Sequence, residues 1–306
     1  MILVTGGAGF IGSHVVAELL KTNVAEVVIY DNFARGKRDY VAPYLKDSRC
    51  KFFLDGADIR DTDILDTAMR GCDYVFHLAA MWLLHCKEYP RTAFETNIQG
   101  TFNVLEACVN NGVSKLIYSS SASVYGDADE IPMTENHSFN NRNFYGATKI
   151  AGEAMCRAFY DRYDLDYVGL RYMNVYGPNQ ISKGSMATVI GIFERCYKNK
   201  KPMPVVKPGN QTRRFTHIDD TVGICFEAWK KNKCLHYSIS HKKSYSIEGL
   251  ARMFKTKIIY LKSRPGERYA SALTKISNNR QIIHKYGKID LKDYVISFIK
   301  GKNYEN

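Results

Sequence analysis

The first twelve residues constrain the fold more than any other stretch of the chain. They read Met1-Ile-Leu-Val-Thr-Gly-Gly-Ala-Gly-Phe-Ile-Gly12, an apolar strand followed by a glycine-rich turn, and the next eight residues carry apolar side chains at helical spacing. Glycines at positions 6, 9 and 12 would allow a tight turn, the close approach of a pyrophosphate and close packing of helix on strand. The helix N-terminus offers free N–H groups to phosphate. Between a strand and a helix, this glycine pattern predicts a dinucleotide-binding site.

Strand and helix patterns alternate along the first half of the chain. Further strands are expected at residues 26–30, 50–54, 73–77, 114–119 and 166–171, and helices at 62–70, 90–110 and 143–163. The connections are short enough for right-handed crossovers, so the alternation predicts a Rossmann-type, doubly wound parallel sheet of the α/β class. Beyond Tyr172 the alternation loosens, and Gly and Pro cluster. We therefore expect a dinucleotide-binding domain at 1–172 and a smaller C-terminal α/β substrate domain at 173–306, with room for chain crossovers between the two.

The net charge of +12 is unevenly distributed. Residues 1–180 carry a net −5 and residues 181–306 a net +17. A basic C-terminal part would attract an anionic substrate, a nucleic acid or a membrane surface, although a lysine-rich solvated face explains it equally well. Runs such as Lys198-Asn-Lys-Lys201 lack the interleaved aromatic residues of a single-strand-binding groove, so no nucleic-acid partner is expected.

The eight cysteines are scattered, without a C-x-x-C pair or a His/Cys cluster. This spacing is typical of reduced, buried thiols and predicts neither a disulfide framework nor a metal site. The first strand begins at Met1, which leaves no room for a secretory signal, and no apolar run reaches about 18 residues, the length of a membrane span. The expectation is a cytoplasmic protein without membrane partners.

The second expected strand ends at Asp31-Asn32, and this position bears on the choice of cofactor. An acidic residue about 20 positions beyond the glycines suits a ribose with two free hydroxyls and repels a 2′-phosphate. Asp31 therefore favours NAD over NADP. A turn-forming Asp-Asn pair is the alternative interpretation, and the basic residues Arg35, Lys37 and Arg38 keep NADP open.

Three residues form a candidate catalytic set: Ser121 at the end of a strand, and Tyr145 and Lys149 on the following helix. Tyrosine and lysine four residues apart share one helix face, so the ammonium can lie near the phenol. Tyrosine with a pKa near 10 is a poor base at neutral pH, and we expect the Lys149 charge and an oxidised nicotinamide to lower that pKa. Ser121 would hydrogen-bond the same reacting oxygen.

These motifs occur together, in the same order, in one known family. The stretches concerned are Thr5–Gly12, Asp31-Asn32, Asp58-Ile59, His77–Ala80, Asn97–Thr101, Ser119–Ser121, Tyr145 with Lys149, Arg171–Pro178, Arg213–Asp220 and Arg264–Glu267. Over essentially its whole length the chain resembles the extended short-chain dehydrogenases/reductases of the nucleotide-sugar epimerase/dehydratase family. Within that family it is most similar to UDP-glucose and UDP-N-acetylglucosamine 4-epimerases.

The resemblance implies a role for each matching position. NAD would be held by Gly6, Gly9, Phe10, Ile11, Gly12, Asp31, Asn32, Lys37, Asp58, Ile59, Leu78, Ala79, Ala80, Asn97, Ser119, Tyr145, Lys149 and Tyr172. Asp58 and Ile59 would flank the adenine, and residues 78–80 would border the nicotinamide. The nucleotide-sugar substrate would contact Ser121, Tyr145, Asn174, Arg213, Arg264 and Ser271, with the two arginines on its diphosphate.

The residues that follow the catalytic serine separate the reactions of this family. Dehydratases carry Asp-Glu there and decarboxylases a Glu, whereas this chain has Ala122 and Ser123, which hold no proton usefully near neutral pH. The resemblance therefore implies 4-epimerisation through a transient 4-keto sugar, with Tyr145 taking the proton of the 4-hydroxyl. A 4,6-dehydratase or decarboxylase is the alternative if His85 supplies the missing proton transfer. A non-catalytic NAD-binding sensor is a further alternative.

Some positions depart from the family pattern and leave the substrate open. The loop Met81–Cys86 has an unusual sequence, Arg214 stands where relatives usually have Asp, and residues 179–190 do not match the segment beside the uracil clearly. UDP is assumed because most 4-epimerases of the family use it. A serine at position 271 would leave room for a 2-acetamido group. The resemblance also implies a homodimer that pairs the helices at about 92–110 and 144–162, through residues such as Phe94, Val104, Met155 and Phe159.

Overall fold

The computed structural model describes residues 1–126, 133–134, 137–184, 187–231, 233–262, 273–275 and 287–301. The chain forms two compact units. The first comprises Met1–Val124, Asn141–Arg171 and Cys225–Tyr237, and the second Tyr125–Asn140, Tyr172–Ile224 and Ser238–Asn306. The expected change near residue 172 coincides with one of these crossings. A single boundary is nevertheless insufficient, because the chain also enters the second unit at Tyr125 and returns to the first at Cys225.

A seven-stranded sheet organises the first unit, in the order β12-β7-β5-β4-β1-β2-β3. The strands are β1 (Ile2–Thr5), β2 (Val27–Tyr30), β3 (Cys50–Phe52), β4 (Tyr74–His77), β5 (Lys115–Ser121), β7 (Asp166–Tyr172) and β12 (Leu235–Ile239). β1 pairs in parallel with both β2 and β4, so the strand order reverses at β1. Ligands bind at such a reversal in open α/β sheets, next to the carboxyl ends of the strands. The predicted doubly wound α/β fold is confirmed.

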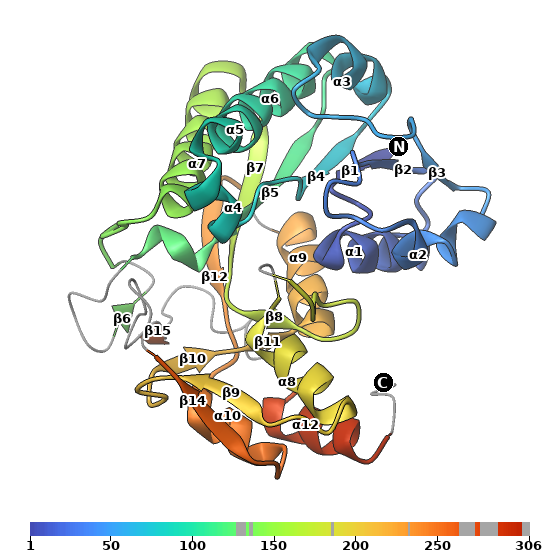
Figure 1. Cartoon of the computed structure of the whole chain (residues 1–306). Helices are drawn as coiled ribbons and strands as arrows, with labels where there is room; N and C mark the ends of the chain where they lie inside the picture. The colour runs from blue at the N-terminus through green and yellow to red at the C-terminus, as the bar shows by residue number, and fades with distance from the viewer. Residues whose placement is uncertain are drawn as a thin grey trace. The chain divides into compact units, whose positions relative to one another are not determined.

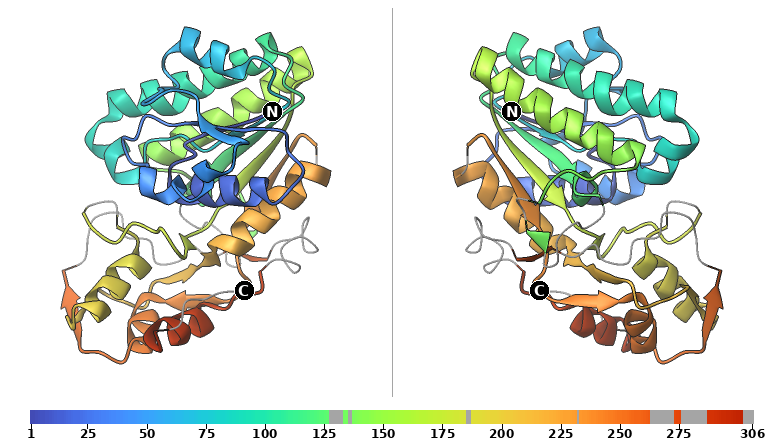
Figure 2. Two further views of the ribbon diagram at one scale, coloured as in Figure 1. Left: turned by 90° about the vertical axis from the view of Figure 1, so that its right-hand side faces the viewer. Right: turned by 90° about the vertical axis from the view of Figure 1, so that its left-hand side faces the viewer.

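Helices cover both faces of this sheet (Figure 1). They are α1 (Phe10–Leu20), α2 (Arg38–Val41), α3 (Thr62–Met69), α4 (Leu83–Glu88), α5 (Pro90–Phe94), α6 (Gly100–Asn110), α7 (Phe144–Tyr163) and the end of α9 (Ile218–Lys231), with short 3₁₀ turns η1 (Tyr44–Lys46) and η3 (Ala122–Val124). Figure 2 shows α6 and α7 side by side on one face and α1 on the other. Buried residues of α3, α6 and α7 pack against β-strand side chains such as Leu3, Val75 and Leu116.

The chain between β4 and β5 differs from its prediction. A single helix was expected over 90–110, but the structure has α5, a π-helical stretch η2 (Glu95–Gln99) and α6. The preceding segment, expected as a loop, contains α4. A π-helical turn adds a residue to the helix and is often found at functional sites. Here it carries Asn97, whose side chain is 1% exposed.

Local sequence explains how α7, the longest helix, begins and ends. The Asn143 side chain accepts a hydrogen bond from the Gly146 amide at 2.8 Å, which caps the N-terminus. The helix ends at Asp164 in the left-handed conformation, with φ of 57°. Gly152 is required in between, since a Cβ there would lie 2.0 Å from the Tyr118 hydroxyl of β5. This close approach sets the helix directly on the strand that carries Ser121.

Among its described residues the second unit contains short strand pairs, three whole helices and the first part of α9. β9 (Met203–Val206) pairs with β14 (Ile258–Leu261), β8 (Val175–Tyr176) with β11 (Thr216–His217), β10 (Thr212–Arg214) with β13 (Ser244–Ser246), and β6 (Met133–Thr134) with β15 (Leu273–Lys275). α8 (Val189–Lys198), α10 (Ile247–Met253) and α12 (Leu291–Ile299) share a core with Met203, Val205 and Phe215.

All eight cysteines are free thiols, as their spacing predicts, and only Cys234 is more than slightly exposed. Within the described ranges no helix combines the length and apolarity that a membrane crossing requires. The same ranges contain no group of three or more His, Cys, Asp or Glu side chains that could hold a metal ion.

Candidate active site

The glycine turn between β1 and α1 leaves no room for a side chain at Gly6 or Gly12. Gly6 has φ of +70°, and a Cβ there would lie 2.7 Å from the Ala79 amide nitrogen. A Cβ on Gly12 would lie 2.1 Å from the Gly6 carbonyl oxygen. Gly9 is the N-cap of α1 and provides no side-chain cap. The first amides of α1, those of Phe10 and Ile11, therefore face a cradle in which backbone N–H groups can bind phosphate.

Asp31 is fixed beside this turn at the end of β2. Its carboxylate accepts hydrogen bonds from the Ala8 amide at 2.9 Å and the Phe33 amide at 2.8 Å. Burial raises the pKa of Asp31 above its usual range, against the effect of those two amides. Since a carboxylate has about four acceptor positions, Asp31 can still accept from ribose hydroxyls. The cradle and this acceptor fit NAD. Lys37, by contrast, places its ammonium 5.3 Å from the centre of the Tyr40 ring.

The residues expected around the adenine follow β3. Asn32 donates to the Asp58 carboxylate at 2.8 Å. Burial alone would raise the pKa of Asp58, but hydrogen bonds from Arg60 and Asn32 lower it. Ile59 is only 4% exposed. A Cβ on Gly100 would lie 2.7 Å from the Ile59 Cδ1, so the Ile59 side chain packs on α6, and the Ile59 carbonyl accepts a hydrogen bond from Asn103 at 3.0 Å.

The turn Leu78–Ala80 lies directly against the glycine turn, and the hydrogen bonds of His77, the residue before it, hold it in place. The Leu78 amide donates to the Thr5 carbonyl at 3.0 Å, and the His77 ring lies between the Thr5 and Thr101 hydroxyls. Thr101 donates its proton to the Asn97 carbonyl at 2.7 Å. His77 must therefore donate to Thr101 through Nε2 and accept from Thr5 through Nδ1. This neutral tautomer connects β1, β4 and the π-helical stretch.

Protonation of His77 would break this chain of hydrogen bonds, which makes stability depend on pH. Burial lowers the pKa of His77 from its ordinary value of 6.5 to about 3. The stabilisation is complete above pH 6.5 and is lost as the pH falls toward 3, because the unfolded chain then binds the extra proton. Between pH 6.5 and 4.5 we expect the wild type to lose about 2 kcal/mol of unfolding free energy through His77, a loss that His77→Asn should not show. Urea unfolding at several pH values measures this difference, with His85→Asn as the control. An equal fall of the unfolding free energy with pH in the wild type and both variants would contradict the prediction.

Asn97 was expected to contact the cofactor, but its amide is already used within the protein. The side chain accepts from the Met81 amide at 2.6 Å, and donates to the Met81 carbonyl at 3.0 Å and the Thr148 hydroxyl at 3.1 Å. It thereby fixes the start of the Met81–Cys86 segment against α7. Its direct role in this structure is to position the loop.

The structure brings Ser121, Tyr145 and Lys149 together in the first unit. The Ser123 amide donates to the Ser121 Oγ at 3.1 Å, so the Ser121 hydroxyl proton is free for its hydrogen bond with the Tyr145 phenol. The Lys149 ammonium donates to the Ser119 carbonyl at 2.7 Å. It lies 5.8 Å from the Tyr145 ring centre and 5.1 Å from the Tyr118 ring centre. This is the arrangement required for proton transfer at an oxygen bound near Ser121 and Tyr145.

The electrostatics of the site differ in part from the prediction. Burial raises the pKa of Tyr145 to about 12, although the Ser121 hydrogen bond and the Arg35 charge act in the opposite direction. Burial also lowers the pKa of Lys149 to about 8. The expected lowering of the Tyr145 pKa by Lys149 together with an oxidised nicotinamide stays a prediction for the protein with bound cofactor. Desolvation of the phenolate outweighs the nearby cations.

The Met81–Cys86 segment holds two groups of potential chemical interest. His85, on α4, packs edge-on against Tyr89 at 6.1 Å between ring centres. Cys86 is buried, its thiol donates to the Met81 carbonyl at 3.5 Å, and burial raises its pKa to about 11. Neither side chain has a described hydrogen bond to Ser121 or Tyr145. The described contacts of His85 and Cys86 therefore give neither side chain a part in proton transfer at Ser121 or Tyr145.

One pair of side chains could not be found from the sequence. The Arg35 guanidinium, from the loop after β2, lies 5.3 Å from the centre of the Trp82 ring, and its positive charge acts on Tyr145. The sequence suggested Arg35 only as a binder of the 2′-phosphate of NADP. No local pattern links positions 35 and 82, so only the fold reveals their contact.

The remaining site predictions fall in the second unit. Tyr172 ends β7 and is 8% exposed. Asn174 donates to the Arg214 carbonyl at 2.7 Å, and Arg213 donates to the Thr212 carbonyl at 2.8 Å. Successive residues of a strand point to opposite faces, so Arg213 and Arg214 on β10 face different ways. Arg264 and Ser271 lie outside the described residues, and their roles stay predictions.

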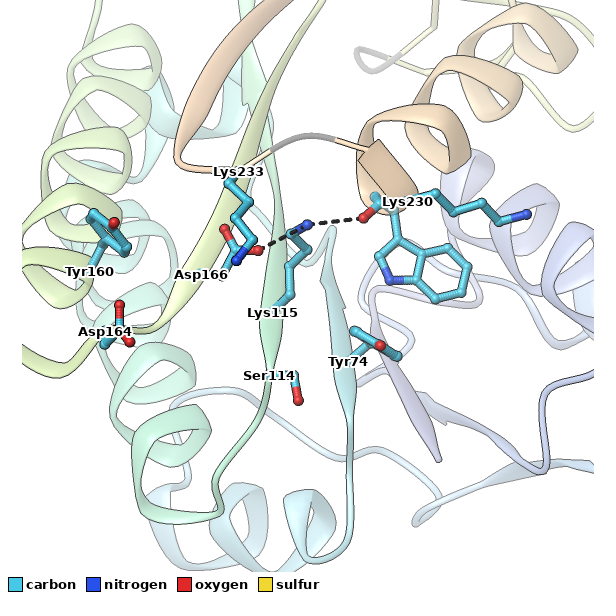
Figure 3. A pocket seen from close by; sticks show the side chains of 9 residues that line it. Tyr74, Ser114, Lys115, Tyr160, Asp164, Asp166, Lys230 and Lys233 are labelled. Carbon is cyan, nitrogen blue, oxygen red and sulfur yellow. Dashed lines mark hydrogen bonds and ion pairs between the residues drawn. The ribbon is translucent and has the colours of Figure 1, made fainter.

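A pocket of about 560 Å³ in the first unit lies at the wrong edge of the sheet for this chemistry (Figure 3). It is lined by Tyr74, Ser114, Lys115, Tyr160, Asp164, Asp166, Trp229, Lys230 and Lys233. These residues lie at the starts of β4, β5 and β7 and at the ends of α7 and α9, whereas ligands of doubly wound sheets bind at the carboxyl ends of the strands. Lys115 pairs with Asp166 at 2.9 Å and donates to the Trp229 carbonyl at 3.0 Å, which satisfies the buried charge.

Comparisons with known proteins agree with this geometry. The model of the NAD dependent epimerase/dehydratase family matches residues 2–240. A putative UDP-glucose 4-epimerase of Methanocaldococcus jannaschii is 35% identical over 318 residues, which cover 99% of both chains. The solved UDP-N-acetylglucosamine 4-epimerase of Methanobrevibacter ruminantium, in complex with UDP-N-acetylmuramic acid, aligns with a TM-score of 0.87 and 30% identity over 98% of both chains.

A solved structure with a different activity is equally similar in fold. DesIV of Streptomyces venezuelae, a dTDP-glucose 4,6-dehydratase with NAD bound, aligns with a TM-score of 0.87 and 26% identity over 98% of this chain and 96% of its own. Fold alone thus leaves the reaction undecided between epimerase and dehydratase. The family match, the glycine cradle and the Ser-Tyr-Lys set agree on the broader assignment. The chain belongs to the NAD-dependent epimerase/dehydratase family of extended short-chain dehydrogenases/reductases, and NAD is its cofactor.

Proposed function

We propose that the protein catalyses the 4-epimerisation of a nucleotide-diphosphate sugar, with UDP-hexoses and UDP-N-acetylhexosamines as the first candidates. The observation that carries the proposal is the contact of Ser121, Tyr145 and Lys149 next to a strand end at which the two described residues after Ser121, Ala122 and Ser123, are neither acids nor bases. Ala122 and Ser123 form the 3₁₀ turn η3 at that point. Oxidation and re-reduction at one carbon need a single acid/base group, and dehydration needs more.

In the proposed reaction Tyr145 handles one proton in both directions. It accepts the proton of the sugar 4-hydroxyl, and later returns it to the same oxygen after the 4-keto sugar has turned its other face. Bound NAD supplies the group that accepts and returns the hydride of carbon 4. Ser121 donates a hydrogen bond to the reacting oxygen. Lys149 lies near the Tyr145 phenol and favours its charged form, a role that its own lowered pKa makes sensitive to pH above about 8.

The dehydratase alternative is supported by DesIV among the structural relatives. It requires an acid and a base that the described site does not show near Ser121, since the His85 ring packs on Tyr89. A decarboxylase requires a glutamate at the second position after the serine, where Ser123 stands. A non-catalytic NAD-binding sensor has no need of the Ser-Tyr-Lys set. These alternatives become outcomes of the test below.

We further propose that the second unit binds the substrate through Asn174, Arg213, Arg264 and Ser271, with a serine at 271 leaving space for an acetamido group. The environment of Arg214 supports the binding of an anionic ligand by the second unit. Arg214 is 8% exposed, its Nε has no hydrogen-bond partner among the residues that the structure describes, and burial lowers its pKa. A buried guanidinium without a counter-charge is costly, and a nucleotide diphosphate or another acidic group would offset that cost.

A homodimer through α5, α6 and α7 is also part of the proposal, with revised contacts. Phe94 and Phe102 are 43% and 42% exposed, so they can meet a second copy. Val104 and Phe159, which the sequence also suggested, are 0% and 8% exposed and pack in the core of the first unit. Met155 packs partly against that core. A cytoplasmic location remains the expectation for a protein with free thiols.

Proton NMR of the anomeric region tests the proposed function. Protein purified without added cofactor is incubated with UDP-glucose, UDP-galactose, UDP-N-acetylglucosamine and UDP-N-acetylgalactosamine. We expect interconversion of one 4-epimeric pair without external NAD, because the cofactor ends each turnover in its starting state. Preference for the acetamido pair would support the role of Ser271. A 4-keto-6-deoxy product would overturn 4-epimerisation in favour of dehydration. No turnover of any of the four sugars, with NAD bound, would contradict these substrates and direct the search to other bases, to uronic acids and to the sensor.

A further inference from the structure

The loop that follows β2 is docked on the glycine turn. The Lys37 amide donates to the Ala8 carbonyl at 2.9 Å, and the Ala8 amide donates to the Asp31 carboxylate at 2.9 Å. Gly36 is required at this contact, because a Cβ there would lie 2.8 Å from both Asp31 carboxylate oxygens and 3.0 Å from the Ala8 carbonyl carbon. Arg35 immediately precedes this contact, so its backbone is held against the turn that cradles phosphate.

The Arg35 guanidinium has an aromatic neighbour but no acceptor. It lies 5.3 Å from the centre of the Trp82 ring, within the range of a cation–π interaction. Among the described residues, no carboxylate or carbonyl oxygen accepts a hydrogen bond from it, whereas the nearby Arg38 is paired with Asp55. The side chain is also partly buried, and burial lowers its pKa. A partly desolvated guanidinium without an anion is an unsatisfied group.

Trp82 is held in place independently of Arg35. It is the N-cap residue of α4, and the preceding Met81 is fixed by both hydrogen bonds of its backbone to Asn97, at 2.6 and 3.0 Å. The Trp82 backbone is therefore anchored, and its ring offers a surface on which the Arg35 side chain can rest. The guanidinium is limited to what it can reach from a backbone docked at Ala8, which includes the ring and the glycine turn.

An anion bound at the glycine turn would satisfy two groups at once. The N-terminus of α1 has no side-chain cap and carries a partial positive charge. Arg35 supplies a full positive charge with donors in a fork that matches phosphate oxygens. We propose that Arg35 binds the diphosphate of NAD, with Trp82 as its resting platform, and thereby retains the cofactor between turnovers. This inference depends on NAD as the cofactor and is independent of the proposed 4-epimerisation.

The 2′-phosphate of NADP offers the same chemistry as a diphosphate, so the test must separate the two. Asp31 argues for the diphosphate, because its carboxylate lies against the same loop and would repel a phosphate on the adenine ribose. NAD and ADP contain the diphosphate without the 2′-phosphate, and NADP contains both. The ligands for which an Arg35 variant loses affinity therefore identify the phosphate group that Arg35 binds.

The experiment measures dissociation constants for NAD, ADP and NADP by isothermal titration calorimetry on the cofactor-depleted full chain. Arg35→Gln removes the charge, Arg35→Lys keeps it without the fork, and Arg91→Gln removes an exposed arginine of α5 as a charge-matched control. We expect Arg35→Gln to raise the dissociation constants of NAD and ADP roughly 10- to 100-fold, since a charge-assisted hydrogen bond is lost. Arg35→Lys should fall between Arg35→Gln and the wild type, and the control should stay within about twofold of the wild type.

Two results would overturn the inference. One is an NAD dissociation constant for Arg35→Gln that matches the control, and the other is a loss confined to NADP, which would assign Arg35 to the 2′-phosphate. A thermal unfolding midpoint within a few degrees of the wild type shows that a variant is folded. If Arg35→Gln does not fold, Arg35→Lys still tests the inference. The cofactor content of the purified proteins gives a second readout, because Arg35→Gln should retain less NAD than Arg91→Gln.

Discussion

Tyr145→Phe should lower the turnover of the proposed 4-epimerisation by roughly 10²- to 10⁴-fold while leaving NAD bound, because it removes the proposed proton acceptor at the reacting oxygen. The Tyr145 ring stays in the variant, so its packing and the 5.8 Å approach of the Lys149 ammonium are retained. Only the hydroxyl that bonds Ser121 is lost. This one substitution therefore distinguishes a defect in the proposed proton transfer from a defect in cofactor binding.

The measurement is the rate of interconversion of the preferred UDP-sugar pair, followed by NMR, together with the cofactor content of each protein. Tyr163→Phe is the matched control, since Tyr163 ends the same helix, is 53% exposed and should retain wild-type turnover. More than a tenth of wild-type turnover in Tyr145→Phe would contradict its role as the acid/base. If NAD were lost as well, the defect would be one of cofactor binding.

Gly12→Ala should destabilise the first unit severely, by about 3 kcal/mol or more. The added Cβ would lie 2.1 Å from the Gly6 carbonyl oxygen and 2.8 Å from the Gly7 Cα. Both are backbone atoms, so no side-chain rotation can relieve the overlap, and α1 must move away from β1. We expect a lower midpoint of thermal unfolding and no retained NAD.

Gly9→Ala provides a graded comparison within the same motif. Its added Cβ would meet only the Gly6 carbonyl oxygen, at 3.0 Å, and its φ of −77° suits any residue. We expect its unfolding midpoint to stay within a few degrees of the wild type, while its cofactor content falls because the methyl group narrows the phosphate cradle. Circular dichroism and the absorbance of released NAD measure both quantities. Equal destabilisation by the two substitutions would show that the contacts of Gly12 do not determine the packing of α1.

The sequence determined the parts of this protein that depend on local patterns. Apolar runs, the glycines at 6, 9 and 12 and the alternation of strand and helix define a doubly wound sheet, because each signal acts over a few neighbouring residues. The order of the motifs was enough for the family. The same local reasoning missed the π-helical stretch at Glu95–Gln99, since periodicity does not reveal one inserted residue in a helix.

Only the tertiary structure decided the contacts and the electrostatics. His77 has one tautomer because Thr5 and Thr101, 72 and 24 residues away, meet its ring. Tyr145 has a raised pKa because burial outweighs the nearby cations, a balance that depends on how deeply the fold encloses the phenol. Arg35 rests on Trp82 because two loops converge at the reversal of strand order beside β1. Each of these depends on residues far apart in the chain, whose distance and desolvation are fixed only when the sheet assembles.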